Sequence, residues 1–127
     1  MTVPTLQRPI SNTPQQALTL LNDPTYVEAA RVFAARIITD GGPSTFDRLN
    51  WAYRHALSRE PKPAELPVLA ELLAKHRTQY ATTRPSAEKL IATGEAPVAK
   101  DVDPVELAAW TSVARTILNL HETITRN

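Results

Sequence analysis

The sequence predicts an all-α fold, an irregular bundle of five or six helices with no sheet. Residues that cap helix N-termini stand directly before proline at several points along the chain, a pairing typical of helix starts. Apolar residues recur with the spacing of one helical face in four segments, and no segment of useful length alternates with the period of a strand. With 127 residues, of which 43% are hydrophobic, the chain is long enough to form one packed core.

Four helix starts can be placed from their capping residues. Thr13-Pro14-Gln15-Gln16 combines an N-cap, a proline at the first helical position and a glutamine three residues after the cap, which makes a capping box. Asp23-Pro24 and Asp103-Pro104 repeat the cap and the proline, and Ser44 with Asp47 is a weaker form. We therefore expect one helix to begin directly after each of these caps.

Four apolar stripes indicate which faces the helices bury. The stripes are Val27, Ala30, Phe33, Ala34, Ile37 and Ile38; Phe46, Leu49, Tyr53, Ala56 and Leu57; Leu66, Leu69, Leu73, His76 and Tyr80; and Leu107, Trp110, Ala114, Ile117 and Leu118. Each follows the i, i+3, i+4, i+7 spacing that keeps side chains on one face of a helix. Pro67 falls inside the third stripe, so that helix either begins later than Pro63 suggests or has an irregular first turn.

The expected organisation is an extended N-terminal segment over residues 1–12 followed by a single helical domain over residues 13–127. Residues 92–102, which include Gly94 and Pro97, are expected to form a loop before the last helix. Asn119 suits the C-terminal end of that last helix, because asparagine tolerates the left-handed backbone found there.

Composition excludes several classes of function. The absence of cysteine excludes disulfides, thiolate catalysis, iron–sulfur clusters and covalent c-type haem attachment within this chain. A formal net charge of +1 gives no strong field for phosphate backbones, so no nucleic-acid partner is expected. No apolar run approaches the length of a membrane span, and residues 1–10 lack the apolar core of a signal peptide. As written, the chain carries no export signal.

No sequence pattern indicates a metal or a cofactor. His121-Glu122 looks like the start of a zinc-protease motif, but the position four residues after the histidine is Thr125. His55 and His76 fall on different predicted helices, where single histidines usually lie at the boundary of the core. No lysine followed by serine or threonine comes after a glycine, as a phosphate-binding loop requires. We therefore assign no catalytic, cofactor-binding or metal-binding residue.

Carboxylates are numerous, and they leave open an alternative, part of an enzyme acting on polysaccharide. Glycoside hydrolysis needs two carboxyl groups placed across a cleft. Several of the acids, including Asp23, Asp103 and Glu106, instead stand at caps and in first turns, where a negative charge offsets the helix dipole. The structural interpretation of these residues is the favoured one.

The candidate contact residues surround one of the two tryptophans. Trp110 lies on the apolar stripe of the last helix and is expected in the core, whereas Trp51 is out of phase with the stripe of its own helix. An exposed tryptophan beside Arg48, Arg54 and His55 would suit contact with a partner or a sugar ring. The other interpretation is that Trp51 packs into a second buried face.

Three long phrases of the sequence resemble one protein family. They are Ser11 to Pro24, then Arg54 to Pro61 with Pro63 to Leu66, and finally Glu106 to Arg115 followed by Leu118 to Leu120 and Glu122. They occur in the family's order and spacing. The family is the planctomycete, cytochrome-associated family with domain of unknown function 1553. The resemblance covers the chain from about Arg8 to Arg126.

This resemblance implies the C-terminal region of a much longer protein. Members of the family resemble large exported proteins with a second domain of unknown function, often behind a cytochrome-c-like module that carries a Cys-x-x-Cys-His haem site. The present chain has no such motif. The implied partners are the upstream domains of a parent protein, or a separate protein that takes their place. The resemblance brings no catalytic residues with it.

Together these observations give three hypotheses. The leading one is a non-catalytic helical module, an accessory domain that makes protein contacts within a larger exported protein. The alternative is part of an enzyme acting on polysaccharide. The third is a nucleic-acid-binding bundle, because Arg48, Arg54 and Arg59 cluster on one predicted helix and its end, although the near-neutral charge makes it the weakest of the three.

Overall fold

The computed structural model describes residues 23–94, 97 and 101–126, and of residues 121–126 it describes only the backbone. In this part of the chain every regular element is a helix, as the sequence predicts. The extended segment expected over residues 1–12 and the helix expected after Thr13 lie outside the described residues.

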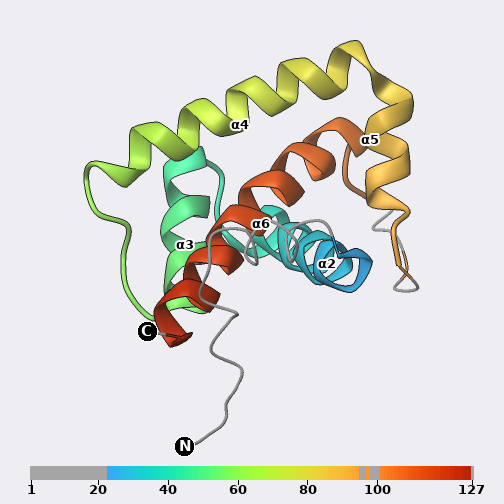
Figure 1. Ribbon diagram of the computed structural model, residues 1–127. Helices are drawn as coiled ribbons and strands as arrows, with labels where there is room; N and C mark the ends of the chain where they lie inside the picture. Colours follow the sequence, from blue (N-terminus) through green and yellow to red (C-terminus); the bar gives the residue numbers. More distant parts are fainter. Residues whose placement is uncertain (1–22, 95–96, 98–100, 127) are drawn as a thin grey trace, which may run out of the picture.

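The described helices surround one central helix. They are α2 (Pro24–Asp40), α3 (Thr45–Leu57), α4 (Glu65–Thr82), α5 (Arg84–Ile91) and α6 (Pro104–Arg126). Helix α6 contacts each of the other four. In Figure 1 it runs through the middle of the molecule, with α4 crossing above it, α3 on the left and α5 on the right. None of the described helices is long and apolar enough to cross a membrane.

Three helix starts use the caps that the sequence predicts. Asp23 accepts a hydrogen bond from the backbone N–H of Thr25 at 2.9 Å. Ser44 Oγ accepts from the N–H of Asp47 at 3.1 Å, and Asp103 Oδ2 accepts from the N–H of Glu106 at 3.0 Å. Each bond satisfies a backbone donor that has no partner inside the first turn of a helix.

The residues at the end of α3 and at the two ends of α4 determine where these helices stop and where α5 begins. Helix α3 ends at Ser58, which has a left-handed backbone with φ of 58°. Helix α4 begins at Glu65, so Pro67 is its third residue, where a missing N–H breaks no bond. A single residue, Thr83, separates α4 from α5, and Pro85 follows within the first turn of α5. The sequence pattern predicts no helix over Arg84–Ile91, so α5 is found only in the structure.

The core is built around the first half of α6. Its buried apolar side chains are Leu107, Ala108, Ala109, Trp110, Val113, Ala114 and Ile117. The alanines among them leave room for the backbones of the surrounding helices to approach closely, and the large indole of Trp110 fills the space between. The prediction that Trp110 lies in the core is confirmed.

One member of the predicted stripes is wrong. Leu49, Ala52 and Tyr53 form the buried face of α3, whereas Phe46 is 53% exposed. At 100° per residue, Phe46 and Tyr53 differ in direction by only about 20°. Phe46 is therefore on the correct face but in the first turn of α3, and its exposure follows from its place at the helix end.

A buried arginine fixes the loop that precedes α6. Arg31 on α2 is 2% exposed, and its Nε and Nη1 atoms donate to the carbonyl oxygens of Thr93 and Pro97, each at 3.1 Å. Gly94, with φ of 91°, lies so close to the Glu28 side chain that a Cβ atom would collide with it. The described residues of the stretch 92–102 contain no helix, which agrees with the loop that the sequence predicts.

Candidate functional site

Trp51 is half-buried on α3 and lies against side chains of two helices. Its ring stacks on that of His55, with 3.8 Å between the ring centroids and 22° between their planes. Phe33 of α2 lies 6.0 Å away, centroid to centroid, and the guanidinium carbon of Arg36 lies 5.4 Å from the Trp51 ring. His55 Nδ1 is 2.9 Å from the Trp51 carbonyl oxygen. The structure therefore joins Trp51 to Phe33 and Arg36 of α2, which the sequence pattern does not place at the site.

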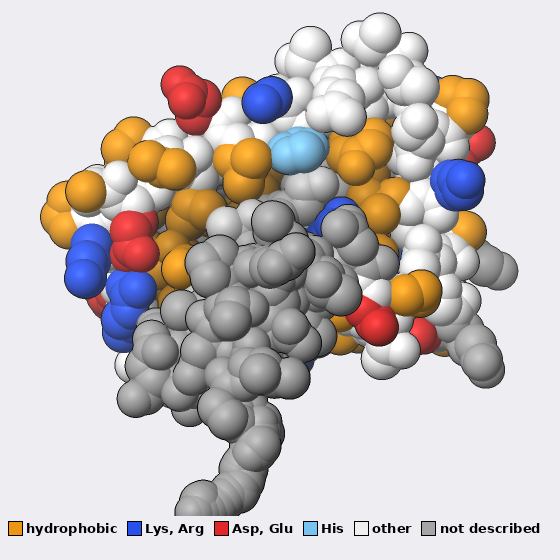
Figure 2. All heavy atoms as spheres, viewed as in Figure 1, with side chains coloured by type: hydrophobic (Ala, Val, Ile, Leu, Met, Phe, Trp, Pro, Cys, Tyr) orange, Lys and Arg blue, Asp and Glu red, His pale blue; other side chains and the backbone are white. Residues whose placement is uncertain are grey.

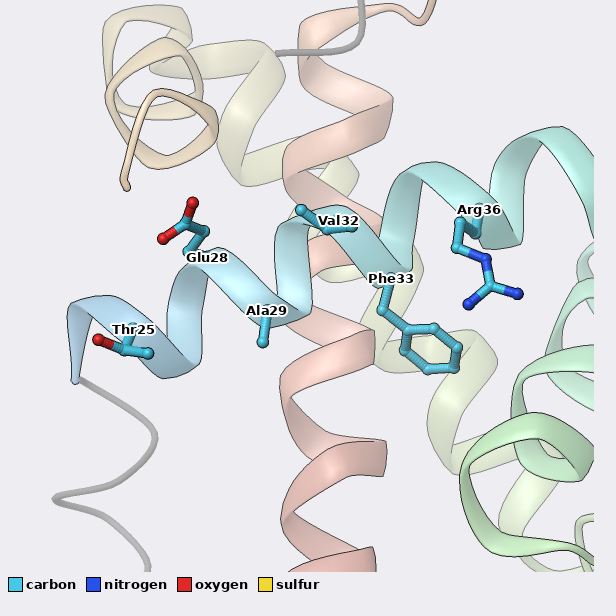
Figure 3. Close-up of a pocket in the computed structure, with 6 residues that line it drawn as sticks. All are labelled: Thr25, Glu28, Ala29, Val32, Phe33 and Arg36. Atoms are coloured by element: carbon cyan, nitrogen blue, oxygen red, sulfur yellow. The ribbon is translucent and has the colours of Figure 1, made fainter. Parts of the chain in front are cut away.

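The face of α2 next to Trp51 forms a shallow hollow of about 460 Å³. We call it the α2 outer surface, and its residues are Thr25, Glu28, Ala29, Val32, Phe33 and Arg36. Figure 3 shows Thr25, Ala29 and Phe33 projecting to one side of the helix, with Val32 and Arg36 along the same stretch. Val32 is 40% exposed and Ala29 is exposed as well, so the middle of this surface is apolar and open to solvent.

Residue spacing explains why α2 carries two apolar faces. Val27, Ala30, Ala34 and Ile37 recur at helical spacing and are buried in the bundle. Ala29, Val32, Phe33 and Arg36 repeat the same spacing, displaced around the helix, and form the α2 outer surface. The sequence predicts Phe33 on the buried stripe, whereas its side chain lies at the border between the two faces and is partly buried.

Arg48 does not join Trp51. Its Nε donates to the Gly42 carbonyl at 3.0 Å and its Nη2 to the Ile38 carbonyl at 3.3 Å, so it ties the start of α3 to the end of α2. Its guanidinium carbon also lies 5.8 Å from the centre of the Trp110 ring. With only 19% of its side chain exposed, Arg48 holds a corner of the fold together.

Arg54 shares a second hollow with Trp51. This hollow, of about 250 Å³, is lined by Asp40, Gly41, Gly42, Asp47, Asn50, Trp51 and Arg54, and we call it the Trp51 hollow. Nη2 of Arg54 lies 3.7 Å from Oε2 of Glu60, and both side chains are mostly exposed. Of the four predicted contact residues, the structure groups Trp51, His55 and Arg54, and it places Arg48 elsewhere.

The carboxylate of Glu106 contacts side chains from three helices. From the sequence alone, Glu106 is recognisable only as an acid in the first turn of a helix. Its carboxylate accepts hydrogen bonds from Arg77 Nε at 3.0 Å and from the buried indole Nε1 of Trp110 at 3.1 Å. Arg48 Nη1 lies 3.8 Å from the same carboxylate. Helices α3, α4 and α6 thus meet at one charge. Nothing in the sequence spacing brings residues 48, 77 and 106 together, so only the tertiary fold reveals this cluster.

A second charged cluster joins α3 to α4. Arg59 donates from Nη1 and Nη2 to the two carboxylate oxygens of Glu65 at 2.9 and 3.2 Å, and the backbone N–H of Lys62 donates to the same carboxylate at 2.7 Å. These donors, Arg59 first, lower the pKa of Glu65 from 4.5 to about 2. Burial, followed by the charge of Glu65, raises the pKa of Tyr53 to about 12. The cluster is a structural clamp.

No metal centre is found among the residues whose side chains are described, since no three His, Cys, Asp or Glu side chains lie close enough together to hold an ion. Two of these acids, Asp40 and Asp47, line the Trp51 hollow together. The main feature of the region is an exposed apolar stripe on α2 beside two partly buried aromatic rings, with charges at its margin. Such a surface is suited to making contacts.

Comparisons with known proteins add one finding. Residues 1–73 match the family described as a protein of unknown function, DUF1553 (PSD1). The matched residues make up more than half of the chain and include the phrases at 11–24 and 54–66, whereas the phrase at 106–122 lies beyond them. No curated protein and no solved structure matches the chain.

Proposed function

We propose that this chain, which belongs to the DUF1553 family of proteins of unknown function, is a non-catalytic helical module that packs against other domains of a longer exported protein. The contact surface in this proposal is the α2 outer surface together with Trp51. The observation that carries the proposal is the second apolar stripe of α2, which the rest of the described bundle leaves open.

The physical argument concerns how many apolar faces a surface helix needs. A helix at the edge of a bundle is stabilised by one buried stripe and normally has polar residues on the other side. On α2 the outer side instead carries Ala29, Val32 and Phe33, and it continues into Trp51. Tryptophan and arginine are both enriched among the residues that contribute most of the binding energy at protein interfaces.

The resemblance to longer proteins supports the position of the module. We infer that it forms the C-terminal end of a planctomycete protein whose upstream part contains the domains that cover α2. The mass of the native polypeptide tests this part of the proposal. A mass well above the 14.0 kDa of this chain is expected, and a native mass near 14.0 kDa would exclude packing within one polypeptide.

Dye binding tests the surface itself. The free chain should enhance the fluorescence of a dye that binds exposed apolar surface, and Val32→Glu should remove most of that signal, because the charge falls in the middle of the apolar stripe. Val68→Glu is the matched control, since Val68 is 66% exposed but lies on α4, outside the α2 outer surface. A monomeric chain without dye binding, or equal effects of the two variants, would contradict the proposal.

An enzyme acting on polysaccharide is the second candidate, and the observation in its favour is the Trp51 hollow. Asp40, Asp47 and Trp51 line this hollow together, and a tryptophan ring beside two carboxyl groups suits a sugar. Turnover of a polysaccharide that is lost in Asp40→Asn and in Asp47→Asn would support this candidate. Unchanged turnover in both variants would remove it.

The nucleic-acid hypothesis has the least support. Arg48, Arg54 and Arg59 each lie within 4.0 Å of a carboxylate oxygen, on Glu106, Glu60 and Glu65 respectively. Pairing of this kind reduces the positive charge that a row of phosphates would meet. A fluorescence titration that finds no salt-sensitive binding of DNA or RNA would exclude it.

A further inference from the structure

The proposed contact surface has a basic residue at one end, Arg36 of α2. Its side chain is exposed, and its guanidinium carbon lies 5.4 Å from the centre of the Trp51 ring. Figure 3 shows the Arg36 side chain extending to the same side of α2 as the phenyl ring of Phe33. The attraction between a cation and an aromatic ring holds this guanidinium next to the apolar stripe.

Arg36 differs from other arginines in its lack of an acidic partner. In the described part of the chain, six arginines lie within 4.0 Å of a carboxylate oxygen: Arg31, Arg48, Arg54, Arg59, Arg77 and Arg84. Figure 2 shows basic and acidic side chains gathered at the left edge of the molecule, where Figure 1 places α3 and the start of α4. Among the residues that the structure describes, Arg36 pairs with no carboxylate, and its side chain donates no hydrogen bond. Even Asp40, at the i, i+4 spacing of a helical ion pair, instead lines the Trp51 hollow.

The contact with Trp51 leaves the hydrogen-bond donors of Arg36 available. A cation–π contact is an electrostatic attraction to the ring and takes up none of the five N–H groups of a guanidinium. In the separate chain these groups face solvent, because the side chain is exposed. A domain that covers Val32 and Phe33 removes solvent from Arg36 as well, since all three residues line the same hollow. Removing water from a cation costs free energy unless a group of opposite charge replaces that water.

From these observations we infer that the domain covering the α2 outer surface presents an Asp or Glu carboxylate to Arg36. This inference rests on the proposed function, because it names the chemistry of the partner at the same surface. The two oxygens of a carboxylate match the forked donors of a guanidinium, so one acidic side chain replaces the lost water and fixes how the domain meets α2. A surface without such an acid leaves Arg36 unpaired and is disfavoured. Arg36 therefore selects the partner, while the apolar stripe supplies the area of contact.

Carbodiimide coupling of the native polypeptide with Arg36→Lys tests the pairing directly, because this reagent condenses an amine and a neighbouring carboxylate into an amide without a spacer. The substitution should leave the fold intact, since the Arg36 side chain is exposed and has no hydrogen-bond acceptor among the described residues. We expect mass spectrometry to find an amide between position 36 and an Asp or Glu outside residues 1–127.

Arg84→Lys is the matched control for the coupling. Nη2 of Arg84 on α5 lies 3.9 Å from Oδ1 of Asp103, and both side chains are mostly exposed. The variant should therefore couple to Asp103 and to no acid outside the 127 residues of this chain. This product shows that the reagent reaches a carboxylate at the distance of an ion pair.

Arg36→Gln in the native polypeptide tests the strength of the contact. It removes the charge, and it should weaken docking of the covering domain by about tenfold, the usual effect of losing a charge-assisted hydrogen bond. The measurement is hydroxyl-radical oxidation of Phe33 across a urea titration that stays below the unfolding of the bundle. Arg84→Gln, an exposed arginine outside the contact surface, should leave the oxidation of Phe33 unchanged.

Two results would overturn the inference while leaving the proposed function in place. One is protection of Phe33 that is equal in the native polypeptide and in its Arg36→Gln variant. The other is coupling of the Arg36→Lys variant to Asp40 alone, or to no carboxylate, while Arg84→Lys couples to Asp103. Equal oxidation of Phe33 in the native polypeptide and in the separate 127-residue chain is a different outcome. It shows that no domain covers α2, and the proposed function and the inference then fail together.

Discussion

At the scale of single residues, Glu106 joins side chains of α3, α4 and α6 through one carboxylate. It accepts hydrogen bonds from Arg77 and from the buried indole of Trp110, and Arg48 lies near the same carboxylate. Polar groups at the edge of a core are stable only when their partners are present. Removal of Glu106 therefore leaves the Trp110 indole and the Arg77 guanidinium without this acceptor and takes a neighbouring negative charge away from Arg48.

Glu106→Ala is expected to lower the free energy of unfolding by about 1–3 kcal/mol, because the buried indole N–H of Trp110 loses its acceptor, whereas the Arg77 side chain, which is 40% exposed, is solvated by water. Denaturant unfolding followed by circular dichroism measures the loss. Glu71→Ala is the matched control, since Glu71 is an exposed glutamate on α4, and it should change stability by less than about 0.5 kcal/mol. Similar losses in both variants would contradict the role given to Glu106.

Glu65 gives a prediction about acid. Its pKa is lowered to about 2 in the folded chain, against 4.5 ordinarily, so the clamp with Arg59 stabilises the fold above pH 4.5 and is lost as the pH falls towards 2. The side chain is 25% exposed, and this reduces the contribution to about 1–2 kcal/mol. Chemical denaturation of the chain and of Glu65→Gln at several pH values should show a stability difference that closes across this range.

The control for that measurement is Glu60→Gln. Glu60 lies 3.7 Å from Arg54, but its side chain is 70% exposed, so its removal should have little effect at any pH. If the difference between the chain and Glu65→Gln stays constant from about pH 6 to about pH 2.5, the bond between Arg59 and Glu65 does not act as described.

At the scale of elements, the central position of α6 depends on small side chains. Ala114 is fully buried, as are Ala108 and Ala109, because neighbouring helices approach the backbone of α6 closely. Ala114→Leu should force these helices apart and lower the free energy of unfolding by about 1–3 kcal/mol. Thermal unfolding measures the effect. Ala74→Leu, on the exposed side of α4, is the control, and an equal loss there would show that α6 is not closely packed.

Helix starts were predictable from the sequence because their cause is local. Each of Asp23, Ser44 and Asp103 acts on a donor two or three residues away, so the chain itself contains both partners. The break at Thr83 was missed because a single residue ends one helix and begins the next, and only Pro85 marks it. The suggestion that Asn119 ends the last helix was wrong, since α6 continues to Arg126. Phe46 was misplaced because periodicity gives the face of a helix and not how far the neighbouring helices cover it.

The candidate site was predictable only in part. Trp51 was recognised because it departs from the stripe of α3, and the structure places His55 and Arg54 with it. The partners on α2, Phe33 and Arg36, follow from the packing of two helices and have no signature in the sequence. The sequence also groups Arg48 with Trp51, because the carbonyl groups of Gly42 and Ile38 that hold Arg48 at the end of α2 have no sequence signature either.

At the scale of the whole molecule, helix α2 has two apolar faces, and the described residues cover only one of them. Helix α6 packs against the inner apolar stripe of α2, whereas the described residues leave the outer stripe, beside Trp51, uncovered. This asymmetry is the basis for the proposed docking role. Belonging to the DUF1553 family is consistent with it but adds no activity, because that family's function is itself unknown.

Hydroxyl-radical footprinting of the native polypeptide and of the separate 127-residue chain tests the docking claim most directly. The account predicts that Phe33 and Trp51 are oxidised more slowly in the native polypeptide, while Phe46, which is 53% exposed and outside the contact surface, is oxidised equally in both. Equal oxidation of Phe33 and Trp51 in the two samples would contradict it.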